Sequence, residues 1–384
     1  MLKFNLREWL SKRYDLEKIE GPLQYQIKKP LPRSTGWFHT LGSMSLLLFI
    51  SQVLTGILLL IYYRPTVDEA FESIKFIMTQ PYMGWLYRQI HAWGANLMVI
   101  VVFLHMLRTF FTGSFKKPRE ITWVIGVFLF VLTLVFGFTG YLLPWNQLAY
   151  WATTVGTEIA GAIPFVGEWM KTLMRGGTSV GGETLSRFFV IHVIILPWIV
   201  FFLIAIHLFL VRFQGIATMD PVGDEKETKV KEKDGIPFFP HHMLKEGVVF
   251  FILLGVLITL SILAPFELGE KADPLTTPEG IKPEWYFLSM YHVLKYFSKL
   301  LGIFVVGLAP VFLLIWPFLD RSPQRHPFKR PISVTIGILV LLSFLVFGIL
   351  GFISESKQKF FGKEYHFDIY GIPHSVQPDK GITK

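Results

Sequence analysis

The sequence contains no cysteine among its 384 residues. This absence excludes disulfide bonds, thiolate metal sites, an iron–sulfur cluster bound by this chain, and haem attached through a thioether bond. Charged residues are scarce, at 17%, whereas 52% of the residues are hydrophobic. We also expect no secretory signal, because the first apolar run begins near residue 37, behind a polar and charged leader.

Seven apolar runs are each long enough to cross a bilayer, for which about 20 apolar residues are needed. They cover residues 41–61, 90–111, 121–143, 187–211, 246–265, 300–319 and 332–353. The sequence therefore predicts an all-α, multi-pass transmembrane protein in which a four-helix bundle is followed by three further transmembrane helices.

The spans and the segments between them divide the chain into five regions. These are a polar leader (1–36), a four-helix region (37–214), a charged linker (215–245), a three-helix region (246–353) and a polar tail (354–384). Within the stretch that follows the third span, "PFVGEWMKTLMRG" (164–176) is expected to form one or two short amphipathic helices on the outer membrane surface.

The net charge of +9 is distributed unevenly across the predicted membrane. Segments on the leader side hold 22 basic and 13 acidic residues, and the other side holds 15 of each. The positive-inside rule therefore predicts a cytoplasmic N-terminus and an outer tail. Topology and contact with the lipid bilayer account for this charge, so we expect no nucleic-acid partner.

Four histidines lie inside two of the predicted spans, where ionisable residues are rare and usually functional. His91 and His105 are 14 residues apart, and His192 and His207 are 15 apart. Each pair falls on roughly one helix face, about 21–23 Å apart along the axis. The two spans run in the same direction, so the pairing suits two stacked haems, each with two axial imidazoles. The alternative is four unrelated buried histidines.

Glycines repeat the same spacing on the two neighbouring spans. Gly42 and Gly56 are 14 residues apart, as are Gly126 and Gly140. Glycine allows another group to approach the backbone closely, so these positions could make room for the two porphyrin rings. Ordinary packing of small residues between helices is the alternative interpretation.

Two arginines, Arg88 and Arg119, flank the predicted bundle. They could form ion pairs with haem propionates. They could equally be plain anchors at the membrane interface.

With these histidines and the sequence "PEWY" after the fifth span, the chain resembles cytochrome b of the cytochrome bc complexes. Specific motifs are "RPTVDEAFESIKFIMT" (64–79), "GSFKKPRE" (113–120), "GYLLPWNQLAYWA" (140–152) and "KADPLTTPEGIKPEWYF" (271–287). They are most similar to the photosynthetic, plastoquinol-oxidising branch, whose two cytochrome b chains are here fused through the charged linker. Seven spans and the 15-residue histidine step agree with that branch.

The resemblance implies the catalytic subunit of a quinol:cytochrome c oxidoreductase. Quinol would bind near the outer face and pass one electron to a Rieske iron–sulfur protein and then to a cytochrome c-type subunit. The other electron would cross from the outer haem (His91, His192) to the inner haem (His105, His207) and reduce quinone near the cytoplasm. Protons would be released outside, and the complex would be a homodimer.

Glu284 lies between Pro283 and Trp285, at the edge of an apolar segment. A half-buried carboxylate there should have a raised pKa and could accept a proton from quinol. Tyr286 is expected as a second polar contact. The alternative interpretation is that Glu284 is an interfacial residue that only caps the helix starting at 284. Arg212, at the end of the fourth span, resembles a residue that lines the cytoplasmic quinone site in relatives, and an ordinary basic anchor on the cytoplasmic side is the equal alternative.

One departure from the photosynthetic branch concerns a haem that the branch attaches through a cysteine. The matching position here is Thr40, so we expect no covalent c-type haem. The fused, cysteine-free form favours menaquinol and a location in the inner membrane of a non-photosynthetic bacterium. We expect His292 to be interfacial. The remaining histidines are expected at the surface or interface: His39, His241, His242, His326, His366 and His374.

Two other classes of protein remain open. A dihaem membrane anchor of a dehydrogenase or hydrogenase would only relay electrons, but such anchors lack PEWY and the three-helix half. A transporter with proton-carrying histidines would bind no haem, and its absorption spectrum would show no b-type bands.

Overall fold

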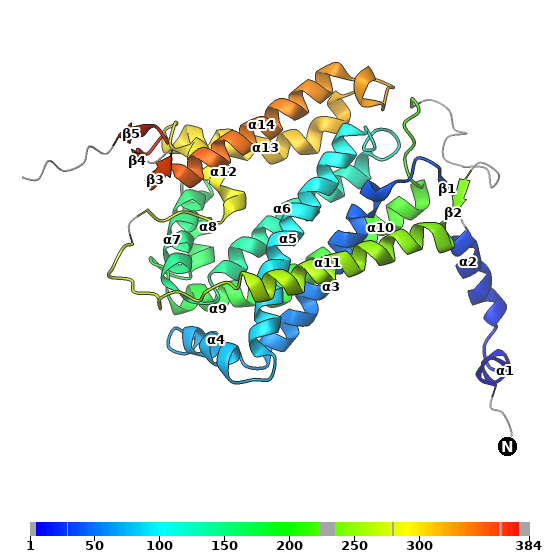
Figure 1. Cartoon of the computed structure of the whole chain (residues 1–384), viewed down its shortest axis with the longest axis horizontal. Helices are drawn as coiled ribbons and strands as arrows, with labels where there is room; N and C mark the ends of the chain where they lie inside the picture. Colours follow the sequence, from blue (N-terminus) through cyan, green and yellow to red (C-terminus); the bar gives the residue numbers. More distant parts are fainter. Residues whose placement is uncertain (1–4, 29, 223–234, 279, 361–362, 376–384) are drawn as a thin grey trace, which may run out of the picture.

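The computed structural model describes every residue except 1–4, 29, 223–234, 279, 361–362 and 376–384 (Figure 1). The described part contains seven helices that are long and apolar enough to cross a membrane. They cover Trp37–Leu60, Gly84–Phe111, Glu120–Tyr141, Gly182–Gln214, Phe238–Leu263, Lys299–Leu319 and Pro331–Ile353. The prediction of a seven-span helical protein is confirmed, although several helices begin up to eight residues earlier than their apolar runs.

The first four spans pack together as a bundle. Helix α3 packs along α5, and α6 packs along α10. The bundle consists of η1 (Trp37–Thr40) with α3 (Leu41–Leu60), α5 (Gly84–Phe111), α6 (Glu120–Tyr141), and α9 (Gly182–Val190) continuing through η2 (Ile191–Ile195) into α10 (Leu196–Gln214).

Of the last three spans, two pack against a shorter helix, α12 (Trp285–Leu294), which contacts mainly α14 and also α13. The spans are η4 (Phe238–His242) with α11 (Met243–Leu263), α13 (Lys299–Leu319) and α14 (Pro331–Ile353). Helix α11 lies against α3 and α5, whereas α13 lies against α6. The three-helix half therefore packs against the four-helix bundle on more than one side.

Short helices and a small sheet gather at one end of the spans, on the left in Figure 1. They are α4 (Ala70–Thr79), α7 (Gln147–Gly161), α8 (Gly167–Arg175), β3 (Lys357–Phe360), β4 (Lys363–Phe367) and β5 (Pro373–Ser375). Helix α8 lies in the stretch 164–176, where one or two short amphipathic helices were expected, whereas α7 lies before that stretch. The antiparallel sheet β3–β4–β5 was not predicted, because its strands lie in a polar tail without an apolar run.

The opposite end carries the N-terminal helices α1 (Leu6–Ser11) and α2 (Leu16–Lys28), which extend away from the body (Figure 1). Strand β1 (Pro30–Pro32) pairs there with β2 (Gly235–Pro237), in antiparallel register. Residues 223–234 of the charged linker lie outside the described residues, and the part of the linker that follows them contacts the leader. A short turn, η5 (Pro327–Lys329), lies between α13 and α14.

A buried charged network joins the two halves at this second end. The carboxylate of Asp320 accepts from Lys116, at 2.5 Å, and from Arg330, at 2.6 Å. Ser333 also donates to Asp320, at 2.7 Å. Lys116 belongs to the loop between α5 and α6, so the network ties the four-helix bundle to the loop between α13 and α14.

Two histidines expected near the surface are buried, and that expectation was wrong. His242 is 4% exposed and lies 3.3 Å from Glu246. His292 is fully buried, and its Nε2 lies 3.1 Å from the hydroxyl of Tyr296. The reason in both cases is packing that a linear sequence does not reveal: α14 covers His292, and α2 packs against η4, which contains His242.

Candidate functional site

The four histidines of the spans face the interior of the bundle in two tiers. The outer tier, His91 of α5 and His192 of η2, has its ring centroids 6.4 Å apart. A metal–nitrogen bond to imidazole is about 2 Å long, so two imidazoles on opposite sides of one metal ion have ring centres about 6 Å apart. The observed spacing fits one iron between the two rings.

The four glycines lie directly against the four histidines. A Cβ atom built on Gly140 would lie 2.5 Å from Cε1 of His192. The matching distances are 3.5 Å from Gly56 to His91, 3.3 Å from Gly42 to His105, and 3.5 Å from Gly126 to His207. Each tier therefore has two histidines and two glycines, with one glycine from α3 and one from α6. This cradle fits a flat ring that approaches both backbones.

The wide turn η2 accounts for the 15-residue step between His192 and His207. Residues Ile191–Ile195 form a π-helical turn, which takes in one more residue than an α-helical turn. His192 lies inside this turn, and Pro197 follows it in the first turn of α10. The extra residue is absorbed beside the histidine, so the inward direction of both side chains is preserved.

Two threonines orient the outer-tier histidines. Oγ1 of Thr55 lies 2.9 Å from Nδ1 of His91, and Oγ1 of Thr139 lies 3.1 Å from Nδ1 of His192. Each hydroxyl donates its single proton to a backbone carbonyl one turn earlier in its own helix. Each hydroxyl must therefore accept from Nδ1–H, which leaves the Nε2 lone pair free for a metal ion.

The inner tier, His105 and His207, lacks this arrangement. The Nδ1 atoms of both residues are buried and neither has a hydroxyl partner among the residues that the structure describes; His207 interacts instead with the backbone of Thr122. The two tiers thus offer a metal ion different surroundings. The threonines that cause the difference directly precede Gly56 and Gly140, but nothing in the linear sequence marked them.

Arg108 is a further residue that the sequence did not single out. It lies three residues after His105, and its guanidinium contacts Nε2 of His39. Nδ1 of His39 accepts from the backbone N–H of Gly36, so the imidazole proton is on Nε2 and faces the guanidinium. No ion pair in the described part of the chain includes Arg108. The two converging donors would be satisfied by an anion such as a haem propionate.

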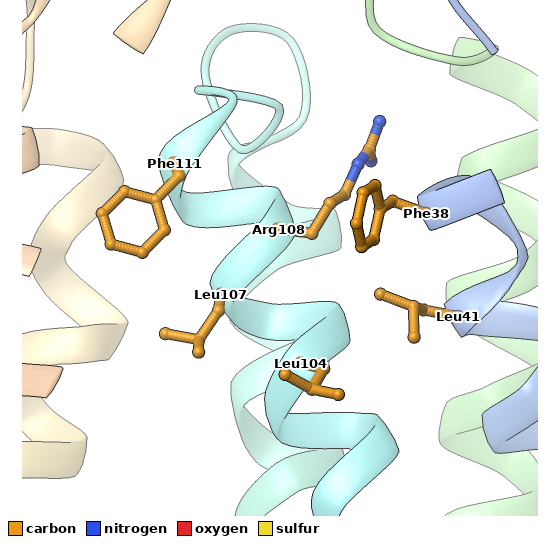
Figure 2. Close-up of a pocket in the computed structure, with 6 residues that line it drawn as sticks. All are labelled: Phe38, Leu41, Leu104, Leu107, Arg108 and Phe111. Carbon is orange, nitrogen blue, oxygen red and sulfur yellow. The ribbon is translucent and has the colours of Figure 1, made fainter. Parts of the chain in front are cut away.

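Arg108 also lines an otherwise apolar cavity of about 330 Å³ (Figure 2). The other lining residues are Phe38, Leu41, Leu104, Leu107 and Phe111. Figure 2 shows that they come from the last turns of α5 and from the η1–α3 junction. The cavity therefore lies at the inner-tier end of these helices.

The three arginines singled out from the sequence have backbone or aromatic partners. Arg88 is buried and donates to the carbonyl of Phe266, which also accepts from Gln89. Arg119 donates to the carbonyl groups at the end of α10. Arg212 lies over the ring of Phe238, 4.9 Å from its centroid. Each arginine is near one tier, and its predicted role stays a prediction.

Glu284 immediately precedes α12 but does not cap it, because its side chain makes no capping hydrogen bond in the described structure. It is half-buried and forms a hydrogen bond with the hydroxyl of Tyr141 at the end of α6. Burial raises the pKa of Glu284, and the hydrogen bond from Tyr141 opposes that rise. Because burial favours the neutral form, a carboxyl group in this setting is suited to accept a proton.

The two residues that follow Glu284 also contact the four-helix bundle. The Tyr286 ring packs against Gly137 of α6, where an added Cβ would lie 2.5 Å from its hydroxyl. The indole N–H of Trp285 donates to Oδ1 of Asn96 in α5, at 2.7 Å. Burial, followed by the charge of Glu284, raises the pKa of Tyr286. Tyr141, Gly137 and Asn96 were not named from the sequence, because their roles depend on how the two halves pack.

Models of two protein-family domains match the chain. Residues 26–215 match "Cytochrome b/b6/petB", and residues 271–367 match "Cytochrome b(C-terminal)/b6/petD". The first covers the four-helix bundle, and the second covers α12, α13 and α14.

Similar proteins span nearly the whole chain. A "Cytochrome bc complex cytochrome b subunit" of Chlorobaculum thiosulfatiphilum is 44% identical over 344 residues, which is 88% of this chain and 78% of that protein. "Cytochrome b" of Rickettsia prowazekii is 36% identical over 351 residues, covering 90% and 86%. Among solved structures, a chain of a "Hyperthermophilic respiratory Complex III" has a TM-score of 0.83 and 33% identity, covering 91% of this chain and 92% of that chain.

These comparisons match both halves in one continuous chain. Membership of this family implies b-type haem binding and electron transfer within a multi-pass membrane complex. The chain therefore belongs to the cytochrome b family of the bc-type quinol:cytochrome c oxidoreductases, as its motifs predicted.

Proposed function

We propose that this chain oxidises quinol near the face that carries Glu284 and passes one electron through two b-type haems to quinone near the opposite face. The observation that carries the proposal is the outer tier, where a ring spacing of 6.4 Å and flanking glycines fit one haem iron. The inner tier repeats the same combination of residues at the other end of the bundle.

The four histidines would hold the two haems without a covalent bond, His91 with His192 and His105 with His207. When bound, the haems supply one-electron chemistry across the membrane. Gly42, Gly56, Gly126 and Gly140 leave room for the rings. Thr55 and Thr139 fix the outer imidazoles with Nε2 directed inward.

Basic side chains near each tier would neutralise the propionates. Arg88 is the candidate near the outer tier. Arg108 and Arg119 are the candidates near the inner tier, and Arg108 is supported by its convergence with His39. Arg212 would line the site of quinone reduction.

Glu284 would accept one of the two protons released when quinol is oxidised. Its burial favours the neutral carboxyl, so it can take the proton within the site and release it to water on the outer side. Tyr141 holds the carboxyl group in position, and Tyr286 provides a second hydroxyl. One electron would leave to a Rieske iron–sulfur protein and then to a cytochrome c-type subunit, and the other would cross the membrane.

The setting of this activity follows from the charge distribution and the resemblance. The complex would be a homodimer in a bacterial inner membrane, with menaquinol as substrate. The N-terminal leader would be cytoplasmic, the 37–214 region would hold both haems, and the 246–353 region would carry the quinol-site loop. The 215–245 linker would also be cytoplasmic, and the 354–384 tail would lie outside.

Haem content tests this proposal directly. The purified chain should yield two equivalents of protohaem, and His91→Leu or His207→Leu should each remove one b-type band. Fewer than two equivalents in the unaltered chain, or unchanged spectra in both variants, would contradict it.

Activity separates an enzyme subunit from a dihaem anchor. Glu284→Gln should keep both haems and lose most quinol oxidation, because the amide cannot accept the proton. Full activity in that variant would support an anchor that only relays electrons.

A further inference from the structure

The hydrogen bond between Trp285 and Asn96 joins two parts of the chain with different tasks. Asn96 lies in α5 between His91 and His105, within a membrane span where an amide group is costly unless its polar atoms are paired. Its Nδ2 donates to the carbonyl of Ala92, at 3.0 Å, so Oδ1 is left to accept from Trp285. Asn96 is therefore oriented toward α12.

The first turn of α12 is held by neighbouring helices rather than by a cap. Three consecutive residues each contact a different residue of the bundle: Glu284 contacts Tyr141, Trp285 contacts Asn96, and Tyr286 contacts Gly137. Tyr141 and Gly137 both belong to α6, so the bond to Asn96 adds a fixed point on a second helix. Contacts on two helices restrict rotation of the turn that carries Glu284.

The other end of α12 is fixed independently. Lys295, just after the helix, forms an ion pair with Glu355 at 2.6 Å. His292 packs against Gly351 of α14. Loss of the Asn96 bond would therefore loosen the first turn while the helix stays in place.

We propose that Asn96 is a positioning residue for quinol oxidation: it holds Trp285, and through Trp285 it keeps the Glu284 carboxyl against Tyr141, ready to accept the proton of the quinol. This inference rests on the proposed function. It assigns to α5 a second task beside that of carrying His91 and His105. Asn96 itself need not touch the quinol.

A double-mutant cycle in the intact complex tests the inference. Asn96→Leu keeps the size of the side chain and removes the acceptor, whereas Trp285→Phe removes the donor. Each should lower kcat/KM about three- to tenfold, the loss expected for one hydrogen bond in a membrane interior. The double variant should have a kcat/KM no lower than that of the less active single variant, because the two substitutions remove the same hydrogen bond. Ile100→Ala, at a lipid-exposed position one turn further along α5, is the matched control and should keep full activity.

The pH profile adds a readout that simple loss of stability would not change. Tyr141 of α6 and Tyr286 of α12 are the titratable groups that interact with Glu284. A loosened turn admits water to the carboxyl group, and because burial is the largest influence on its pKa, the raised pKa falls even though the contact with Tyr141 is also weakened. The acidic limb of kcat/KM should therefore move to lower pH in Asn96→Leu, with both b-type bands retained.

Several results would overturn the inference. Additive losses in the cycle, or unaltered activity and pH profile in Asn96→Leu, would show that the bond does not position Glu284. If Asn96→Leu fails to assemble, Trp285→Phe alone must still show the loss and the shifted limb. Missing haem in the unaltered chain, or full activity in Glu284→Gln, would instead refute the proposed function.

Discussion

Gly140 and His192 lie so close that no side chain fits between them. A Cβ atom on Gly140 would be 2.5 Å from Cε1 and 3.1 Å from both ring nitrogens of the imidazole. Nδ1 of the imidazole also forms a hydrogen bond with the hydroxyl of Thr139, the residue directly before Gly140. One short piece of α6 therefore both orients the ring and leaves it room.

Replacing Gly140 should remove the outer haem. In Gly140→Ala the new methyl group must displace the His192 ring, because contacts this short do not occur. We expect protohaem content to fall from two equivalents toward one, measured by pigment extraction. Gly255→Ala is the matched control, since Gly255 lies in α11 and a Cβ atom added there would meet no other atom within 4 Å. Equal haem content in the two variants would contradict the hypothesis that Gly140 makes room for the outer haem and its histidine.

The threonine hydrogen bonds should set the redox potential of the outer haem. A hydroxyl that accepts from Nδ1–H makes the imidazole a stronger electron donor and so favours the oxidised iron. Thr139→Val should therefore raise the outer midpoint potential by about 40 mV, the equivalent of one hydrogen bond of about 1 kcal/mol. Potentiometric titration of the b-type bands measures the shift, and the inner haem serves as the internal control. If the midpoint potential of the band assigned to the inner haem shifts instead, the two bands have been assigned to the wrong tiers.

Removing the Tyr141 hydroxyl should shift the pH dependence of quinol oxidation. Burial raises the pKa of Glu284, and the hydrogen bond from Tyr141 partly offsets the rise. In Tyr141→Phe the offset is lost and the pKa rises further, so the carboxyl group is protonated, and cannot accept a proton, up to a higher pH. The acidic limb of kcat/KM should move to higher pH, opposite to the shift expected for Asn96→Leu. If the acidic limb of kcat/KM does not move in Tyr141→Phe, Glu284 is not the group that accepts the proton.

The spans and both histidine tiers could be predicted from the sequence because they follow helical periodicity. Fourteen residues are close to four helical turns, so His91 and His105 fall on one face whatever surrounds them. The 15-residue step from His192 to His207 was less secure, because a regular helix would turn the two side chains further apart. The π-helical turn that absorbs the extra residue has no clear signature in residue types alone.

The contacts between the two halves could not be predicted in the same way. Asn96 and Tyr141 are far from residues 284–286 in sequence, and their bonds exist only because the start of α12 meets α5 and α6 in the fold. The strands β3–β5 were missed for a related reason, since short polar strands lack an alternating apolar pattern. Burial of His292 likewise comes from α14, which follows it by about forty residues.

The network around Asp320 should contribute strongly to the packing of the three-helix half against the four-helix bundle. Asp320, Lys116 and Arg330 are each at most 4% exposed at the side chain, so removing the carboxylate leaves two buried cations unpaired. We expect Asp320→Asn to destabilise the protein by about 3–5 kcal/mol, seen as a lower Tm in detergent. Asp15→Asn breaks an exposed ion pair with Lys18 and should change the Tm little.

Acid should weaken the same network only at low pH. Burial alone would raise the pKa of Asp320, but hydrogen bonds from Lys116, Ser333 and Arg330 hold it below its usual value. A carboxyl group with a lowered folded-state pKa contributes stability above the unfolded-state pKa of about 4 and loses it as the pH falls through the folded-state value. The difference in Tm between the unaltered chain and Asp320→Asn should therefore be constant from pH 6 to 8, to within about one degree, and shrink below about pH 4. A difference that already shrinks near neutral pH would mean that the carboxyl group is not held ionised by its partners.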